Sequence, residues 1–181
     1  MSTYISKAAL KRWIPFVILA TIFSGLAYLM VQQIYRQSAN DPLIEITENY
    51  AGFLEAGTPV PDTTNAPKAD LRKSLSTYIA FFDDKAVLTG STMILGDQSP
   101  VPPAGVFETA RAKGEVRFTW QPEKGVQSAV VLRHYNGEKP GFVLAGRSLR
   151  EIEIRESQAL SASIGAWVLS LALTLAVVAF L

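Results

Sequence analysis

The hydrophobic positions of this 181-residue chain form two long apolar runs with a mixed segment between them. Residues 13–35 and residues 157–181 contain no charged side chain. A helix needs about 20 apolar residues to cross the hydrocarbon core of a membrane. Each run is long enough, so the pattern predicts two transmembrane helices. The tail 1–12 and the middle segment 36–156 are then expected on opposite sides of the membrane.

The first run has a second interpretation, because a signal peptide is also apolar and lies at the N-terminus. The apolar region is long for a signal peptide, and Gln37-Ser38-Ala39 is a poor cleavage site. We therefore interpret the first run as a retained anchor.

The middle segment begins with a helical period. Asp41 and Pro42 form a helix-start signal, since Asp caps exposed amides and Pro suits the first helical position. The Pro-rich residues 58–69 predict a loop. A second helix is expected over residues 104–113, between two prolines and a glycine. The first of these helices has apolar residues at helical spacing: Leu43, Ile46, Tyr50, Phe53 and Leu54.

Alternating apolar and polar positions predict the strands. Turn residues separate neighbouring strands, so consecutive strands are expected to pair as antiparallel hairpins. The order of helix, two strands, helix, three strands and exit helix indicates an α+β domain. It predicts a five-stranded antiparallel sheet with the helices on one face. The strands are expected over residues 77–82, 86–94, 115–121, 126–135 and 142–147.

The distribution of basic residues predicts the orientation in the membrane. Lys7, Lys11 and Arg12 precede the first run, whereas only Arg36 follows it closely. Cytoplasmic flanks carry the excess of Lys and Arg, so the N-terminus is expected in the cytoplasm and the middle segment outside. Three arginines before the second run favour the opposite orientation, but the first helix usually dominates. The chain ends at the membrane, which suggests that the protein continues after Leu181.

Composition excludes several classes of function. The net charge is +1 and no basic face is concentrated, which argues against a nucleic-acid partner. The absence of cysteine excludes disulfides and thiolate metal sites. His134, the single histidine, is expected as an exposed strand-end residue, and Asp83 and Asp84 are expected in a solvated turn. No catalytic motif occurs. We predict no enzyme activity, no metal and no cofactor.

Arg147 is the first candidate for ligand binding. It alternates with Val143 and Ala145, so it is expected to point towards an apolar face, where an arginine needs an anionic partner. That partner is either a ligand carboxylate, held by two parallel hydrogen bonds, or a protein acid such as Glu151 at the strand end. The remaining alternative is an Arg147 side chain that is simply exposed to solvent.

Arg133 raises the same two alternatives, a ligand or a salt bridge. The strand aromatics Trp120, Tyr78 and Phe81 either line a small-molecule pocket or fill the core. Together with Arg147, these four residues are the candidate ligand-binding residues.

The last predicted strand leads directly into the second apolar run. Ser148 and Glu151 fit a capping box, in which each side chain accepts a hydrogen bond from the other residue's backbone amide. Glu151 and Arg155 are four residues apart and can pair on one helix face. Residues 149–181 contain no proline, so they predict one helix that transmits a signal from the sheet into the membrane. The alternative is a break near Ser157.

Small residues in the second run favour close helix packing inside the membrane. Ser161 and Gly165 share one helix face. Their partner is either the first run, near Thr21 and Gly25, or another subunit. The alternative is an ordinary content of small residues without a role in packing.

Two stretches of the sequence carry a resemblance to a known group: VPPAGVFETARAKGEVRFTWQPEKG and PGFVLAGRSLREIE. Together with the element order, they resemble the extracytoplasmic PAS-like sensor domains of the Cache or PDC group. Such domains lie between two transmembrane helices in bacterial histidine kinases and chemoreceptors. The resemblance covers about residues 38–156 and both apolar runs. It implies a PAS-like domain at the bacterial inner membrane and a place in two-component signal transduction.

The expected function is a two-pass membrane sensory module that binds a ligand outside and relays a change through its exit helix. The expected partners are the lipid bilayer, a small-molecule ligand, and a second copy of the chain or a membrane signalling protein. The second hypothesis is an accessory subunit of a membrane complex, whose outer domain docks a protein.

Overall fold

The computed structural model of the protein describes residues 7–180. The first six residues of the expected cytoplasmic tail and Leu181 lie outside the described residues, as do the side chains at positions 7–9, 36, 38, 39 and 153. The chain divides into two compact units. One comprises the chain up to Tyr35 and from Glu153 onward, and the other is Arg36–Ile152.

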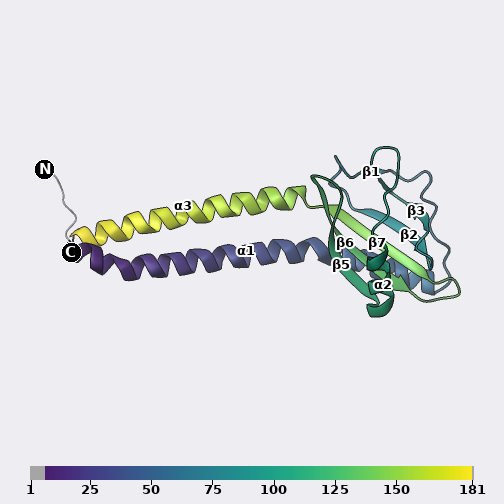
Figure 1. Ribbon diagram of the computed structural model, residues 1–181, viewed down its shortest axis with the longest axis horizontal. Coiled ribbons are helices and arrows are strands. Elements are labelled where there is room, and N and C mark those ends of the chain that lie inside the picture. The colour runs from purple at the N-terminus through teal and green to yellow at the C-terminus, as the bar shows by residue number, and fades with distance from the viewer. Residues whose placement is uncertain (1–6, 181) are drawn as a thin grey trace. The chain divides into compact units, whose positions relative to one another are not determined.

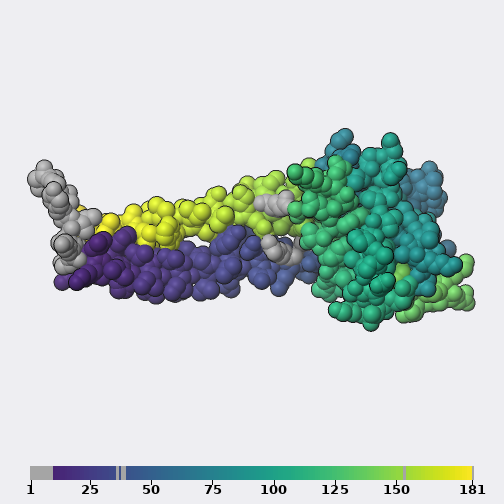
Figure 2. Space-filling view, in the orientation of Figure 1, coloured from purple at the N-terminus to yellow at the C-terminus, as the bar shows by residue number. Residues whose placement is uncertain are grey.

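The first unit consists of parts of two long helices, α1 (Lys7–Glu55) and α3 (Arg150–Phe180). Both helices are long and apolar enough, by length and composition, to cross a membrane. Within the unit they lie side by side (Figure 2). Two hydrogen bonds join them: Trp13 Nε1 donates to Thr174 Oγ1 at 2.9 Å, and Trp167 Nε1 donates to Thr21 Oγ1 at 3.0 Å. Helix α3 continues through residue 157, so the alternative of a break there is wrong.

The helix start predicted at Asp41 and Pro42 is also wrong, because both residues lie inside α1. The ring of Pro42 removes one backbone hydrogen bond, to the carbonyl four residues earlier. The residues around it can keep their own bonds. Extending an existing helix past one lost bond costs less than forming a new helix nucleus.

The second unit is built around a five-stranded antiparallel sheet, as predicted, and the α+β fold class is confirmed. The strand order is β3-β2-β7-β6-β5 (Figure 1), so the last strand, β7, occupies the centre of the sheet. The five strands are β2 (Tyr78–Asp83), β3 (Leu88–Ser91), β5 (Glu115–Glu123), β6 (Val126–Tyr135) and β7 (Gly141–Ser148).

Helices cover both faces of this sheet, so the expectation of helices on one face is wrong. Helix α1 packs against one face through Leu43, Ala51 and Leu54. Helix α2 (Ala104–Lys113), whose bounds are as predicted, packs against the other through Phe107 and Ala110. The reason lies in the central strands, which bury consecutive rather than alternating residues, namely 128–132 on β6 and 141–146 on β7. Both faces of these strands therefore need a cover.

The strand predicted over residues 86–94 is divided into β3 and β4 (Met93–Ile94). Thr92 causes the interruption, because its Oγ1 accepts a hydrogen bond from the amide of Ile79 at 2.8 Å. Strand β4 then pairs in parallel with β1 (Ala69–Asp70), which the sequence pattern does not indicate.

Candidate functional site

The candidate functional site is the junction where the central strand β7 becomes helix α3. The amide of Leu149 donates to Gln127 O of β6 at 2.9 Å. The amide of Arg150 donates to Ser148 Oγ at 3.3 Å, whereas the predicted capping box has the amide of Glu151 as the donor to this hydroxyl. Because Ser148 belongs to β7, the hydroxyl at the start of the helix is held by the sheet.

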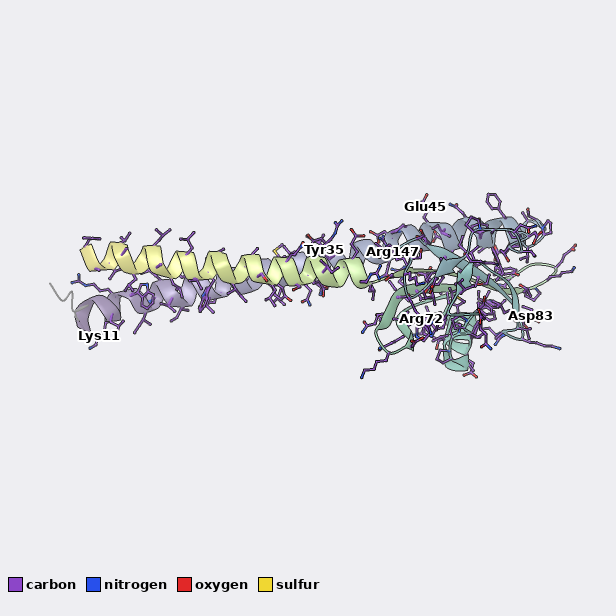
Figure 3. The ribbon with its side chains drawn as sticks, turned by 90° about the horizontal axis from the view of Figure 1, so that it is seen from above. Lys11, Tyr35, Glu45, Arg72, Asp83 and Arg147 are labelled. Carbon is purple, nitrogen blue, oxygen red and sulfur yellow. The ribbon has the colours of Figure 1, made fainter. Side chains whose placement is uncertain are left out.

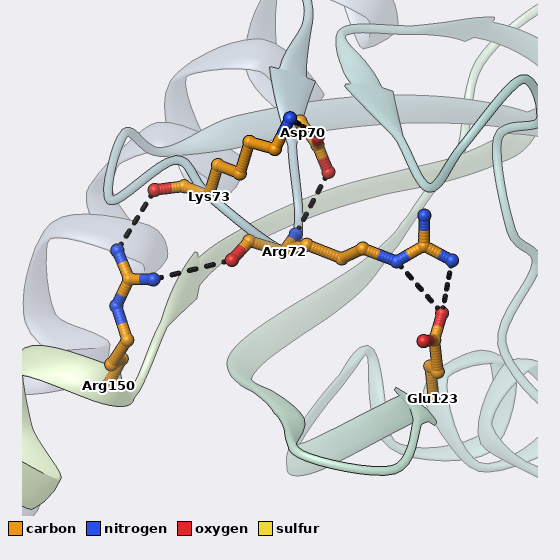
Figure 4. A network of polar contacts seen from close by, with 5 residues as sticks. All are labelled: Asp70, Arg72, Lys73, Glu123 and Arg150. Atoms are coloured by element: carbon orange, nitrogen blue, oxygen red, sulfur yellow. Dashed lines mark hydrogen bonds and ion pairs between the residues drawn. The ribbon is translucent and has the colours of Figure 1, made fainter.

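Arg150, the first residue of α3, reaches a turn that lies far away in the sequence. Its guanidinium donates to the carbonyl oxygen of Arg72 at 3.3 Å and to that of Lys73 at 2.9 Å (Figure 4). Both carbonyls belong to the segment between β1 and β2. Hydrogen bonds from a charged donor are stronger than neutral ones. They hold the first turn of α3 against this segment.

The same turn is attached to a second part of the domain. Arg72 donates to one carboxylate oxygen of Glu123, from Nε at 3.1 Å and from a terminal nitrogen at 2.6 Å. These bonds and the negative charge of Glu123 raise the pKa of the Arg72 guanidinium above its ordinary value. Asp70 Oδ1 accepts the amide of Arg72 at 3.0 Å and fixes the turn. We call the contacts among Arg150, Arg72, Lys73, Glu123 and Asp70 the Arg150 clamp.

The Arg150 clamp joins the start of α3 to both the β1–β2 segment and the end of β5. It lies at the surface, since the side chains of Arg72 and Glu123 are 46% and 43% exposed. Exposed ion pairs contribute little to stability. The clamp can therefore open while the core stays folded.

Sequence reasoning identifies Ser148, Glu151 and Arg155 at this junction but misses Arg150 and its partners. No signal in the sequence reveals the clamp, because the acceptors of Arg150 are backbone carbonyls, which every residue has. The ion pair between Arg72 and Glu123 joins residues 51 positions apart and likewise leaves no local pattern.

The five candidate ligand-binding residues lie on opposite faces of the sheet. Tyr78 and Trp120 belong to the core on the α2 face, and Phe81 to the core on the α1 face. Strand alternation places Arg133 and Arg147 on the α1 face as well. The structure therefore does not bring all five residues into one site.

Arg133 has two acidic partners within the protein. A terminal nitrogen of its guanidinium lies 2.7 Å from Glu48 Oε1 on α1 and 2.6 Å from Glu115 Oε2 on β5. These pairs correspond to the salt-bridge alternative. The side chains of Arg133 and Glu115 are only 26% and 15% exposed, so the pair that joins β6 to β5 is partly shielded from solvent. The pair that joins α1 to the sheet is more open, because the Glu48 side chain is 55% exposed.

Tyr78 is packed into the core on the α2 face. Its ring lies directly over Gly146 of β7, its neighbour in the sheet. Burial raises the pKa of its hydroxyl from 10.0 to about 12, although the nearby Ser128 hydroxyl acts in the opposite direction. The two hydroxyls are close neighbours, yet neither meets the geometry of a hydrogen bond to any described residue. Trp120 is likewise buried, so both aromatics fill the core in the structure.

Arg147 lies near the end of β7, two residues before Leu149 and three before Arg150, the first residue of α3 (Figure 3). The expected apolar surroundings are present, since Ala145 on the same strand face belongs to an apolar cluster against which Leu149, just after the strand, also packs. Its Nε is shielded from solvent and has no hydrogen-bond partner among the described residues.

His134 is not the exposed strand-end residue that the sequence predicts. Its side chain is only 10% exposed, and its ring centroid lies 4.9 Å from that of Phe142. The amide of His134 donates to Gly114 O, just after the end of α2. Asp84 is more than a solvated turn residue, since its carboxylate lies 3.1 Å from Arg111 and 3.7 Å from His134. Within residues 7–180, no three His, Asp or Glu side chains are placed to hold a metal ion.

The predicted membrane-packing residues do not form the contact between α1 and α3. Ser161, Gly165 and Gly25 are all exposed, and a side chain added at either glycine would have nothing within 4 Å. The two helices do meet near Thr21, which the sequence also indicates as a contact point, but through the Trp167 side chain rather than through Ser161 or Gly165.

Comparison of the chain with models of protein families gave no match, and comparison with curated proteins gave none either.

Proposed function

We propose that the protein is a membrane-anchored sensory module whose outer domain responds to a ligand and passes the change to helix α3. One observation carries this proposal: the first residue of a helix apolar enough to span a membrane is clamped to two parts of the sheet domain. A change in either part alters the contacts of Arg150. The chain carries no catalytic role in this proposal.

The proposed topology has two membrane spans, a cytoplasmic N-terminus and an outer domain over residues 36–156 at a bacterial inner membrane. Its supports are the basic residues before the first apolar run and the length of the two helices. A PAS-like domain of the Cache or PDC group is part of the proposal. The element order and the five-stranded antiparallel sheet are consistent with that resemblance.

The energetics of the clamp suit a switch. The two hydrogen bonds of Arg150 are surface contacts, together worth on the order of 1 kcal/mol. A ligand shifts an equilibrium only by its difference in affinity for the two states, and typical coupling energies are about 1–3 kcal/mol. A bound ligand can therefore supply enough free energy to open or close the Arg150 clamp.

Hydrogen exchange of the full chain in lipid nanodiscs tests this role. In Arg150→Gln, the amides of Lys73 and Ser74, which donate to Asp70 O, should exchange faster, together with those of the first turn of α3. The matched control is Lys73→Gln, which removes a neighbouring charge on a side chain that is 85% exposed and leaves the backbone carbonyl in place. Faster exchange in only one of the two segments, or an equal effect of the control, would show that the clamp does not couple them.

A further inference from the structure

Three elements meet at the end of the sheet that lies away from the Arg150 clamp. The last residues of β2 and β6 both lie opposite Gly141, the first residue of β7. The turn after β2 and the end of β6 are therefore neighbours, and a salt bridge joins this turn to α2. Together the three elements bring Asp84 of the turn, Arg111 of α2 and His134 of β6 to one place.

His134 is the only histidine of the chain, and its side chain is 10% exposed. Its Nε2 is shielded from solvent and makes no hydrogen bond to a described residue. In one neutral form of the ring this nitrogen is an acceptor, and in the other it is a donor. Neither form has a partner here, so the neutral ring leaves a buried polar atom unsatisfied, which is unfavourable.

The carboxylate of Asp84 lies next to this nitrogen. Its Oδ1 is 3.7 Å from His134 Nε2, beyond the hydrogen-bond range of about 2.7–3.2 Å. The same oxygen accepts a hydrogen bond from a terminal nitrogen of Arg111 at 3.1 Å, and that nitrogen also donates to the backbone carbonyl of Asp84. The Asp84 side chain is 51% exposed, so it has room for the shift of about 1 Å that a bond to His134 requires.

Phe142 of β7 gives both basic groups the same apolar neighbour. Its ring centroid lies 4.9 Å from that of His134 and 5.2 Å from Cζ of Arg111. An aromatic ring attracts a cation, and charges beside a buried ring interact more strongly than charges in water. A positive charge on His134 is therefore attracted both by the ring of Phe142 and by the carboxylate of Asp84.

The other charged groups on the neighbouring elements are engaged elsewhere or exposed. Asp83 accepts two amides within its own turn. Glu115, at the start of β5, pairs with Arg133, which strand alternation places on the opposite face of the sheet from His134. The exposed ones are Lys85, Lys113, Glu138 and Lys139. Asp84 and Arg111 are thus the two charges that decide the state of His134.

We propose that His134 takes up a proton as its surroundings change from neutral to mildly acidic pH, and that Asp84 then moves from Arg111 to His134. Histidine is the side chain that ordinarily changes its charge between pH 5 and 8. The proton comes from solvent and binds Nε2, which becomes a charge-assisted donor to Asp84 Oδ1. Arg111 then loses its carboxylate partner, so the contact between α2 and the β2–β3 turn weakens. This pH-sensitive switch depends neither on the membrane topology nor on the role of the Arg150 clamp.

The single histidine makes the proton uptake directly measurable. The full chain in detergent micelles, labelled with ¹³C at His134 Cε1, gives one imidazole signal, which should titrate between pH 8 and 5. Asp84→Asn should move the titration to lower pH, because the charged ring loses its carboxylate. Arg111→Gln should move it to higher pH, because a competing cation is removed. A signal that does not titrate in this range, or one that Asp84→Asn leaves unchanged, overturns the proposal.

Two matched controls remove the same charges from exposed positions nearby. Lys113→Gln removes a cation from the last turn of α2, the turn that also carries Arg111. Glu138→Gln removes an acid from the hairpin between β6 and β7. Both variants should titrate as the wild type does. Shifts as large as those in Arg111→Gln and Asp84→Asn would overturn the assignment, because only unspecific charge would then be at work.

The movement of Asp84 has a separate readout. The backbone amide signals of Asp84 and Lys85 should change with the same pH midpoint as the His134 signal. In His134→Gln, which cannot take up the charge, they should stay constant between pH 8 and 5. If His134→Gln does not fold, Arg111→Gln replaces it, and the amide signals should follow the His134 signal to its higher midpoint. Amide signals that are constant in the wild type, or that change independently of His134, refute the switch.

Discussion

Gly146 is the position at which the smallest change should have the largest effect on stability. A Cβ atom added there would lie 2.5 Å from Cε2 of Tyr78, and the ring carbon Cζ and the hydroxyl would be closer still. Carbon atoms in contact prefer about 3.5–4.0 Å. In Gly146→Ala the ring must therefore move by about 1 Å. It has little freedom to do so, since Tyr78 is 1% exposed and its backbone is paired in the sheet.

The expected cost of Gly146→Ala is about 3 kcal/mol, at the upper end of the range for overpacked cores. The assay is denaturant unfolding of the full chain in detergent, followed by the fluorescence of Trp120 with Trp13 and Trp167 replaced by Phe. The matched control is Gly52→Ala. Gly52 is exposed on α1 with nothing within 4 Å of an added Cβ, and the substitution should stabilise the helix by up to about 1 kcal/mol.

A double-mutant cycle isolates the clash from other effects of the new methyl group. In a Tyr78→Leu background the ring is absent, so Gly146→Ala should cost less than about 1 kcal/mol. An equal cost in both backgrounds, or no cost in the wild type, would show that the ring does not rest on Gly146 in the way described.

Three further predictions concern single groups. The unfolded chain releases the Tyr78 proton near pH 10, whereas the folded chain releases it only near pH 12. The free energy of unfolding should therefore fall by up to about 3 kcal/mol as the pH rises through this interval. In denaturant titrations at increasing pH, Tyr78→Phe should lose this part of the pH dependence. Glu115→Gln should destabilise the domain by about 1–2 kcal/mol, more than Glu48→Gln, whose side chain is 55% exposed; equal effects in unfolding experiments would contradict the difference in burial. Ala86 adopts a left-handed backbone with φ of 61°, so Ala86→Gly should raise the thermal midpoint, corresponding to about 1 kcal/mol, and a lowered midpoint would argue against strain in this turn.

The parts of the fold that the sequence predicts correctly are those with strong local signals. Helix α2 begins after Pro103 and ends at Gly114, which has a positive φ of 83°. Strand β6 is predicted with its observed bounds, because its apolar residues are enclosed by a glycine turn on one side and an Asn-Gly pair on the other. Such signals act over a few residues, so they can be recognised without knowledge of the tertiary structure.

The errors arise where distant contacts decide the outcome. The His134 ring packs against Phe142 of β7, and its amide bonds to Gly114 O, some twenty positions earlier. The pairing of β1 with β4 involves only two residues in each strand. The consecutive apolar residues of β6 and β7 were a missed local signal, since a strand buried on both faces needs helices on both sides.

The candidate site shows the same division. Alternation along β7 correctly places Arg147 on an apolar face of the sheet. The partners of Arg133, namely Glu48 and Glu115, are supplied by different elements, so the sequence alone leaves the choice between ligand and salt bridge open. The Arg150 clamp depends on two backbone carbonyls and has no signature in the sequence.

The distance between spin labels on the two apolar helices tests the proposed relay most directly. The chain has no cysteine, so Ile18→Cys and Leu169→Cys, both at exposed positions, give specific labels for the full chain in nanodiscs. Arg150→Gln should change the distance distribution, and Lys73→Gln should leave it as in the wild type. Two glycines inserted after Glu156 should remove the effect of Arg150→Gln. Identical distributions in the wild type and in Arg150→Gln would contradict a relay from the Arg150 clamp into the membrane helix.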